Sequence, residues 1–170
     1  MPLYTLDASF FVQAKNTHFG MDFCPAFWAW VDEMFAKGTF ASCMAVQEEL
    51  ADGDDELAQW AEDKKNAGLF TEPSRDMQSL VGNIADHVVK NYPAHNAEKF
   101  LEKADPWVIA HAKIEKLIVV TNEAAVDSRS KKPKIPNICK VYSVESIDSV
   151  KLLRLLKPSF MSKQRSGATL

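Results

Sequence analysis

The sequence has few cysteines, no basic excess and no long apolar run. Its three cysteines, Cys24, Cys43 and Cys139, form no CxxC pair, which argues against a zinc knuckle or disulfide framework and indicates a reducing compartment. The net charge of −3 provides no overall positive field for nucleic acid, so any such contact needs a local patch. No apolar run is long enough to span a bilayer and no basic segment opens the chain, so we expect a cytoplasmic protein with no membrane partner.

Several nucleotide and metal motifs are also missing. The chain has neither GxxxxGK[ST] nor GxGxxG, which argues against a nucleoside triphosphatase or a dinucleotide-binding enzyme. The four histidines form no HExxH or HxH pair, so a histidine-based metal site is not indicated. Haloacid-dehalogenase phosphatases carry a second Asp two residues after the Asp that ends their first strand, and this chain has Ser9 at that distance from Asp7.

What the sequence does contain is an alternation of strands and helices. The 170 residues suit one domain with a buried core. LYTL (3–6) and LIVVT (117–121) predict buried strands, with weaker ones at LF (69–70) and KVYSV (140–144). We therefore expect a single α/β domain over residues 1–157, with a short central parallel sheet flanked by helices. A polar, flexible C-terminal tail is expected over residues 158–170.

Helices are expected wherever apolar residues recur at helical spacing. The second expected helix begins with Ser42 as a possible cap, and residues 122–137 are expected to form a long polar loop. The expected helices cover residues 24–38, 42–50, 52–68, 75–91, 97–103, 106–116 and 146–156.

Carboxylates stand where these elements begin or end. Asp7 follows LYTL, and Glu123 follows LIVVT, so both are expected at the carboxyl edge of a parallel sheet, where ligands bind. Burying Asp7 without a partner would cost several kcal/mol, so it caps a helix, forms a salt bridge or holds a metal. Asp105 begins a helix and is open to a simple capping role. Glu48 and Glu49, in AVQEEL, are open to a role as solvated surface charges.

Taken together, these motifs resemble PIN domains, from the first residues to about Val144. LDASFFV is similar to their opening strand, which ends in Asp and is followed by an apolar helix. AVQEEL is similar to their helical Glu followed by Leu, and in that register Glu49 is the matching carboxylate. ADPWVIAHAKIEKLIVVTNE resembles their helix-starting Asp, Ile-Ala-x-Ala, strand and Thr-x-Asp. The matching positions are Asp105, Ile109, Ala110, Ala112, Thr121 and Glu123.

The match departs from the family pattern at identifiable positions. Glu123 stands where Asp is commoner, and Pro106 and Trp107 replace small or aliphatic residues. The aromatic helix and GDDELAQW in the first half resemble a less-studied PIN-like branch related to VapC-type toxin ribonucleases. For such a branch, the resemblance implies fold and acids more directly than substrate.

The resemblance implies a Mg²⁺- or Mn²⁺-dependent endoribonuclease, because these hard cations prefer oxygen ligands and activate water against a phosphodiester. Asp7 and Asp105 are expected as direct metal ligands. Glu49 would complete the metal site or orient a water, and Glu123 would be a further ligand or support one. Thr121 is expected to hydrogen-bond an acid or the scissile phosphate.

Two further assignments concern the helical glutamates and the basic loop. Because neighbouring helical residues point about 100° apart, only one of Glu48 and Glu49 is expected to face the site, with Glu48 as the alternative acid. In SRSKKPK, the only basic cluster, Lys131 and Lys132 are expected to contact substrate phosphates. A solvated charged loop is the competing interpretation.

Two functions remain open from the sequence. Small single-domain PIN proteins are commonly toxins of type II toxin–antitoxin pairs, so the resemblance implies a ribonuclease toxin, a small antitoxin partner that covers the acidic cleft, and a possible homodimer. The alternative is a catalytically inactive PIN-like module that binds protein or RNA. All four acidic positions are filled, which favours the nuclease.

Overall fold

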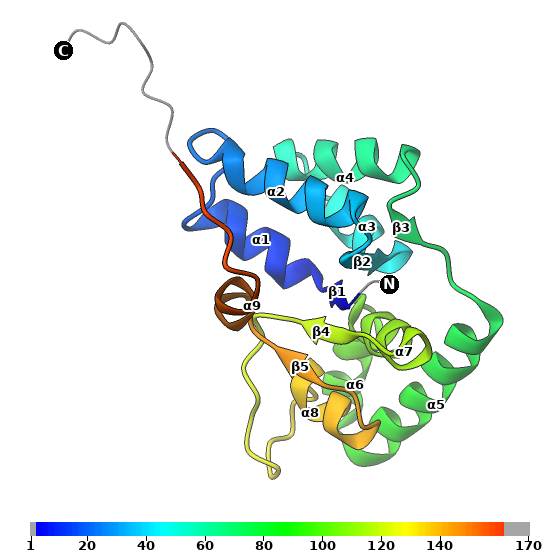
Figure 1. The fold of residues 1–170 in the computed structure, drawn as a ribbon. Coiled ribbons are helices and arrows are strands. Elements are labelled where there is room, and N and C mark those ends of the chain that lie inside the picture. Colours follow the sequence, from blue (N-terminus) through cyan, green and yellow to red (C-terminus); the bar gives the residue numbers. More distant parts are fainter. Residues whose placement is uncertain (1–2, 162–170) are drawn as a thin grey trace, which may run out of the picture.

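A computed structural model describes residues 3–161 of the chain (Figure 1). Within these residues, parallel strands form one sheet in the order β3-β2-β1-β4-β5. The strands are β1 (Tyr4–Leu6), β2 (Phe40–Cys43), β3 (Phe70–Thr71), β4 (Ile118–Val120) and β5 (Ser146–Ile147). The helices are α1 (Ala8–Asn16), α2 (Pro25–Ala36), α3 (Met44–Ala51), α4 (Glu56–Asn66), α5 (Arg75–Asn91), α6 (Ala94–Leu101), α7 (Asp105–Glu115), α8 (Ile135–Val141) and α9 (Ser149–Leu156).

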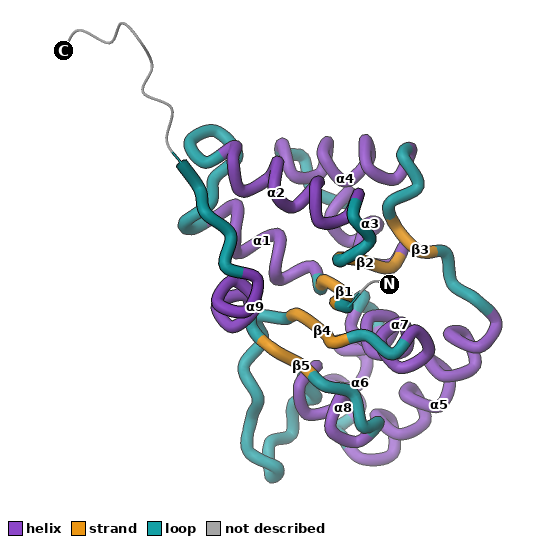
Figure 2. Tube along the Cα trace, viewed as in Figure 1, coloured by secondary structure: helices purple, strands orange, loops and turns teal. Residues whose placement is uncertain are grey.

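The helices cover the short sheet from both sides. In Figures 1 and 2, α1, α2 and α4 lie on one side of the strands and α5 to α8 on the other. Helix α7 packs against β1, β2 and β4 and carries seven buried residues, which explains why its sequence lacks a clear polar stripe. The predicted α/β domain with a short parallel sheet is confirmed.

The strand order places a topological switch point beside β1. From β1 the chain proceeds to β2 and β3 on one side and later returns to β4 and β5 on the other. Leu6 at the end of β1 pairs with Val120 at the end of β4. Open parallel sheets bind ligands at the carboxyl ends of the strands that flank such a reversal. The residues that follow β1 and β4 are therefore the first to consider as a functional site.

An aromatic cluster fills the space between α1, α2 and the end of the described chain. Phe19 stacks on Phe27 with ring centroids 4.2 Å apart, and the ring of Phe160 lies 5.9 Å from that of Phe27. Phe160 lies within the tail predicted at 158–170, so the start of that tail packs on this cluster. Residues 162–170 of that tail lie outside the described residues.

The prediction of Ser42 as a helix cap is wrong. Ser42 belongs to β2, and α3 begins only after Cys43. The Ser42 hydroxyl donates to the carbonyl oxygen of Leu6 in the adjacent β1 at 2.8 Å. Its side chain therefore serves the sheet, because a buried hydroxyl needs a partner and the neighbouring strand supplies one.

The strand predicted at residues 140–144 is also wrong. Lys140 and Val141 end α8, and Ser143 has a φ of +55°, which no strand accommodates. Helix α8 starts inside the predicted loop at 122–137, because Pro136 in its first turn has a backbone suited to helix initiation. The last strand, β5, lies further along at Ser146–Ile147.

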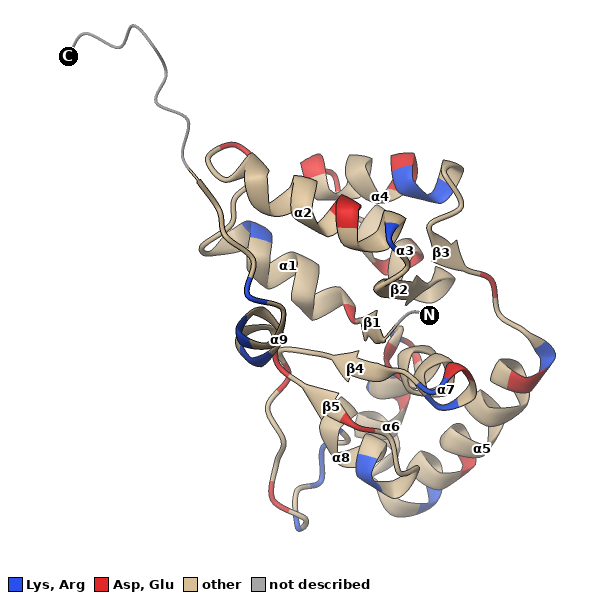
Figure 3. Ribbon diagram, viewed as in Figure 1, with Lys and Arg blue, Asp and Glu red and all other residues tan. Residues whose placement is uncertain are grey.

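Acidic and basic residues are mixed along several helices. Figure 3 shows acidic and basic positions interspersed along α4, α5 and α7. None of the described helices is both long and apolar enough to cross a bilayer.

Candidate functional site

Asp7 lies directly after β1 and caps helix α1. Its Oδ2 accepts hydrogen bonds from the Ser9 backbone N–H at 3.3 Å, the Ser9 hydroxyl at 2.6 Å and the Thr121 hydroxyl at 2.9 Å. Burial raises the pKa of the Asp7 carboxyl, and these hydrogen bonds offset the rise only in part. The negative charges of Glu49 and Glu123 raise this pKa further. Of the three roles left open by the sequence, capping is therefore observed.

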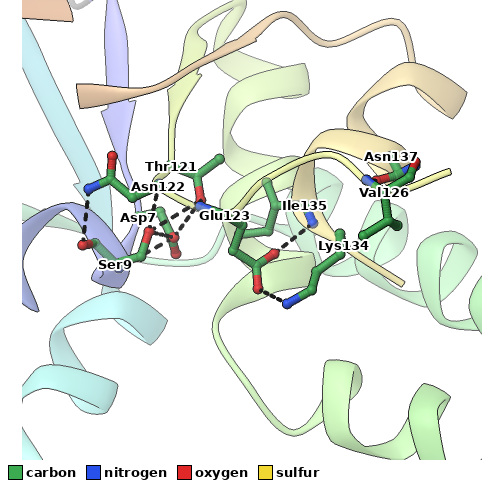
Figure 4. Close-up of polar contacts among 9 residues, drawn as sticks. All are labelled: Asp7, Ser9, Thr121, Asn122, Glu123, Val126, Lys134, Ile135 and Asn137. Atoms are coloured by element: carbon green, nitrogen blue, oxygen red, sulfur yellow. Dashed lines mark hydrogen bonds and ion pairs between the residues drawn. The ribbon is translucent and has the colours of Figure 1, made fainter. Parts of the chain in front are cut away.

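Thr121 connects Asp7 to the chain that follows β4. Its hydroxyl donates to Asp7 and accepts from the backbone N–H of Glu123 at 3.2 Å. Thr121 is 2% exposed, so this hydroxyl is fixed between the two acidic positions, as Figure 4 shows. Its predicted hydrogen bond to an acid is present.

Ser9 and Asn122 belong to the same network, although we assigned them no role from the sequence. The backbone N–H of Asn122 donates to the Ser9 hydroxyl at 2.9 Å, and the Asn122 side-chain oxygen accepts from the N–H and hydroxyl of Ser149. Ser9 thereby joins the ends of β1 and β4, and Asn122 adds the start of α9. The sequence feature that could have indicated them is a polar residue within two positions of each acid, Ser9 after Asp7 and Asn122 before Glu123.

Asp105 is the first residue of α7 and does not cap it. The N-cap is Ala104, without a side-chain hydrogen bond, so the simple capping interpretation is wrong. Asp105 is 7% exposed. Burial is the main cause that raises its pKa to about 8; the charges of Asp7 and Glu123 add to the rise, and Lys103 opposes it. A buried acid without a capping role points to a functional site.

Helix α3 presents Glu49, and not Glu48, toward these acids. Glu49 Oε2 accepts a hydrogen bond at 3.1 Å from the backbone N–H of Ala104, the residue before Asp105. Its charge contributes to the raised pKa of both Asp7 and Asp105. Glu48 lines a different pocket, together with Trp107. The register inferred from AVQEEL thus agrees with the position of the two side chains.

Glu123 is near the other acids but its oxygens are engaged elsewhere. Its Oε1 accepts from the Lys134 ammonium at 2.8 Å, and its Oε2 accepts from the backbone N–H of Ile135 at 3.0 Å (Figure 4). The side chain therefore fixes the start of α8 to the end of β4. Sequence spacing did not indicate this contact, because it depends on how the intervening loop folds back.

The donor atoms of this site fit a hard cation in part. Within residues 3–161, no three His, Cys, Asp or Glu side chains converge closely enough to hold a metal ion. However, the hydrogen bonds that Asp7 accepts all reach Oδ2, which leaves Oδ1 free of them, and Asp105 is not the N-cap of α7. These two carboxylates suit Mg²⁺ or Mn²⁺. The four-ligand arrangement that we inferred stays a prediction.

A cleft of about 440 Å³ opens beside Asp105 and Glu123. Four lysines line it: Lys99, Lys103, Lys132 and Lys134. Of the two lysines predicted to contact substrate, both are exposed, but only Lys132 lines this cleft. The Lys131 backbone oxygen instead accepts a hydrogen bond from the Asn96 side chain at 2.8 Å.

The described cysteines and the buried histidine do not offer a second reactive centre. All three thiols are free, and burial raises the pKa of both Cys43 and Cys139 to about 12. His111 is 1% exposed and hydrogen-bonded to the Thr5 hydroxyl at 2.9 Å. Burial lowers its pKa to about 4, so it is neutral at physiological pH.

Two solved structures share the fold at low sequence identity. One is VapBC2 from Rickettsia felis, solved in complex with a DNA fragment from the VapBC2 promoter. It aligns with a TM-score of 0.52 and 17% identity, over 86% of this chain and 98% of that chain. DNA-bound VapBC from Salmonella typhimurium aligns with a TM-score of 0.51 and 13% identity, over 87% of this chain and 98% of that chain. These likenesses confirm the PIN-like fold expected from the sequence.

Sequence comparison places the chain in a family. Among curated protein sequences, none matches the chain. The family described as "Domain of unknown function (DUF4411)" matches residues 4–160, nearly the whole sequence. The chain therefore belongs to the DUF4411 family and has a PIN-like fold.

Proposed function

We propose that the chain is a Mg²⁺- or Mn²⁺-dependent endoribonuclease that hydrolyses phosphodiester bonds of RNA. The observation that carries this proposal is the pair of buried acids, Asp7 and Asp105, at the switch point of the sheet. Burial raises the pKa of both, and Asp105 lines a cleft that also contains lysines. Like charges gathered in this way are stabilised by a cation.

In this proposal, each residue has a distinct role. Asp7 and Asp105 hold the cation, and Thr121 fixes the orientation of Asp7 through its hydroxyl. Glu49, held by the Ala104 N–H, orients the attacking water. When bound, Mg²⁺ or Mn²⁺ lowers the pKa of water and neutralises charge on the phosphate.

We further propose that the protein is the toxin of a toxin–antitoxin pair. The support is the likeness to VapBC of Rickettsia felis and Salmonella typhimurium, which were both solved with DNA. A small antitoxin would cover the acids of the site, and the toxin would form a homodimer. Expression of the chain alone should arrest growth, and Asp105→Asn should relieve the arrest. Light scattering of the purified protein tests the homodimer.

One observation favours the alternative of an inactive binding module. Both oxygens of Glu123 are engaged by Lys134 and Ile135, so the fourth acid does not extend the cation site. A module of this kind would bind RNA or a protein without cleaving RNA. Cleavage and metal binding separate the two functions, because the inactive module has no need of either.

The test is cleavage of an RNA panel by purified protein with Mg²⁺ or Mn²⁺, and with a chelator. Asp105→Asn and Glu49→Gln should each reduce cleavage by about 10- to 100-fold or more. Glu48→Gln is the matched control, since Glu48 is the adjacent acid on α3 but faces another pocket. It should cleave like the unchanged protein.

Each result leads to a separate conclusion. Cleavage that is lost with chelator and in Asp105→Asn, but kept in Glu48→Gln, supports the nuclease. Cleavage that survives chelator and Asp105→Asn comes from a contaminant and contradicts the proposed site. Absence of cleavage together with absence of Mn²⁺ binding in calorimetry leaves the inactive module.

A further inference from the structure

Glu123 occupies the last acidic position of the PIN pattern, yet its contacts differ from those of a metal ligand. Its two oxygens accept from Lys134 Nζ at 2.8 Å and from the Ile135 N–H at 3.0 Å. Both bonds would have to break before the carboxylate turned to a cation. The extra methylene of Glu over Asp lengthens the side chain, which is consistent with its reach to the start of α8.

The same contacts fix Lys134 at the cleft. Its ammonium is held by Glu123 Oε1, and the next residue, Ile135, is held by Glu123 Oε2. The Lys134 side chain keeps 34% of its surface exposed and lines the cleft. Because an ammonium has three N–H donors, two remain for a ligand after the bond to Glu123.

Helix α6 and the turn after it supply the facing lysines. Lys99 and Lys103 line the same cleft as Lys134. Lys103 lies close enough to Asp105 for its charge to lower the pKa of that acid. The hydrogen bond from Asn96 on α6 to the Lys131 oxygen joins this wall to the basic loop.

The charge and size of the cleft indicate the ligand. Its lining has four lysines against three acids, namely Glu102, Asp105 and Glu123. Lysines at this density suit phosphate groups as point charges. A volume of about 440 Å³ matches a small-ligand pocket. A space of this size suits one or two nucleotides of a single strand.

We propose that Glu123 is a positioning residue for Lys134, and that Lys134, Lys99 and Lys103 bind the phosphates of single-stranded RNA on its way to Asp105. The proposal rests on the ribonuclease function given above and assigns its substrate path. Glu123 is then not a metal ligand. The cation site consists of Asp7 and Asp105, and Glu49 orients the attacking water.

The first experiment measures RNA binding without cleavage. The full chain carrying Asp105→Asn is titrated, with chelator present, into a fluorescent single-stranded RNA while anisotropy is followed at several salt concentrations. Lys99→Ala with Lys103→Ala should weaken binding about tenfold and reduce the salt slope by about 1.4, since each single-strand phosphate contact contributes about 0.7.

The matched control is Lys90→Ala with Lys151→Ala, two exposed lysines on α5 and α9 outside the cleft. This control should bind RNA like the parent, because it removes the same charge elsewhere. Equal weakening by both double variants would overturn the proposal, since it would show a general charge effect. Equal melting temperatures for all variants confirm that each is folded.

The second experiment tests the role of Glu123. Glu123→Gln keeps an acceptor for the Ile135 N–H and loses the ion pair to Lys134. Because Glu123 is not a metal ligand in this proposal, the Mn²⁺ affinity of the variant in calorimetry should match that of the unchanged protein. A metal-ligand role predicts a loss as large as that of Asp105→Asn, and that result would overturn the proposal.

A double-mutant cycle supplies the positioning readout. Lys134→Ala should weaken RNA binding when Glu123 is present and have little effect in the Glu123→Gln background, and Lys134→Arg should restore binding. Additive effects would overturn the pairing. If the unchanged protein cleaves RNA but the lysine variants bind normally, the inference alone fails. If RNA binding depends on the lysines but cleavage is absent, the nuclease proposal fails by itself.

Discussion

Asp7 and Asp105 are two buried acids of one site that differ in the hydrogen bonds their carboxylates accept. Asp7 receives three hydrogen bonds on Oδ2, whereas Asp105 begins α7 without a side-chain cap. Hydrogen bonds to a carboxylate favour its charged form, and burial disfavours it. At Asp105 burial is the main cause, and it raises the pKa of the carboxyl to about 8.

The raised pKa of Asp105 predicts a pH-dependent stability of the metal-free protein. The folded state holds a proton on Asp105 that the unfolded chain releases above its ordinary pKa of 3.8. This group's contribution therefore declines as pH rises from about 4 to about 8, by up to about 1.4 kcal/mol per pH unit. Urea unfolding with chelator across this range measures the decline.

Asp105→Asn provides the comparison, because an amide does not titrate. Its stability should fall less over the same pH range than that of the unchanged protein. Parallel profiles for the two proteins would contradict the assignment of the raised pKa to Asp105.

Ser9 gives a second prediction at the residue scale. Its hydroxyl donates to Asp7 and accepts from the Asn122 N–H, so Ser9→Ala removes one of the three hydrogen bonds to Asp7 and leaves the Asn122 N–H without this acceptor. We expect a loss of about 1–3 kcal/mol in the free energy of unfolding, measured in urea. Ser128→Ala, at an exposed loop position, should change little. A neutral Ser9→Ala would show that the network does not stabilise the fold.

At the scale of elements, long periodic helices were predicted most closely. The bounds expected for α5, residues 75–91, are those observed, because its apolar stripe is regular and Pro93 follows its end. Strand β2 was missed because its FASC sequence has only one large apolar residue. Helix α8 was missed because its first residues were assigned to the loop at 122–137 and its last two to a strand. Its start is held by Glu123, which lies after β4 and accepts from the Ile135 N–H. Local pattern does not contain such long-range contacts.

Asn137 joins the segment between β4 and α8 to α8 itself. Asn137 on α8 donates to the Val126 carbonyl at 2.8 Å and accepts from the Val126 N–H at 3.0 Å. Asn137→Ala should loosen this segment, and trypsin should then cut faster at exposed sites such as Arg129 and Lys131. Asn91→Ala, which removes local bonds on α5, should leave the cleavage rate there unchanged. Equal rates in both variants would contradict the prediction.

At the scale of the molecule, the candidate site joins segments from the whole length of the chain. Asp7, Glu49, Asp105 and Glu123 come from four separate elements or their ends. The sequence motifs predicted these acids as a group, and their mutual effects on pKa agree with that grouping. The roles of Lys99 and Lys103 and the pairing of Glu123 were not predicted, because they follow from packing between elements.

A cation that bridges these segments should stabilise the whole fold. A ligand present at about 100 times its Kd adds about 2.7 kcal/mol, so Mn²⁺ should raise the melting temperature of the metal-free protein. The rise should be larger at about pH 8 than at about pH 6, since Asp105 binds a cation only when deprotonated.

Asp105→Asn should show a much smaller rise with Mn²⁺, and Glu48→Gln should show the full rise. An equal rise in all three proteins would indicate binding elsewhere. No rise in the unchanged protein would argue against the cation site.

The sheet is bordered by two very short strands, and this limits how a partner is bound. β3 and β5 each have two residues and lie at the two edges of the sheet. A visiting peptide that joined either edge as an additional strand would find almost no backbone ladder to extend. Recognition of a second protein must therefore rely on side chains of helices and loops. The choice of partner then depends on the identity of these side chains more than on backbone hydrogen bonds.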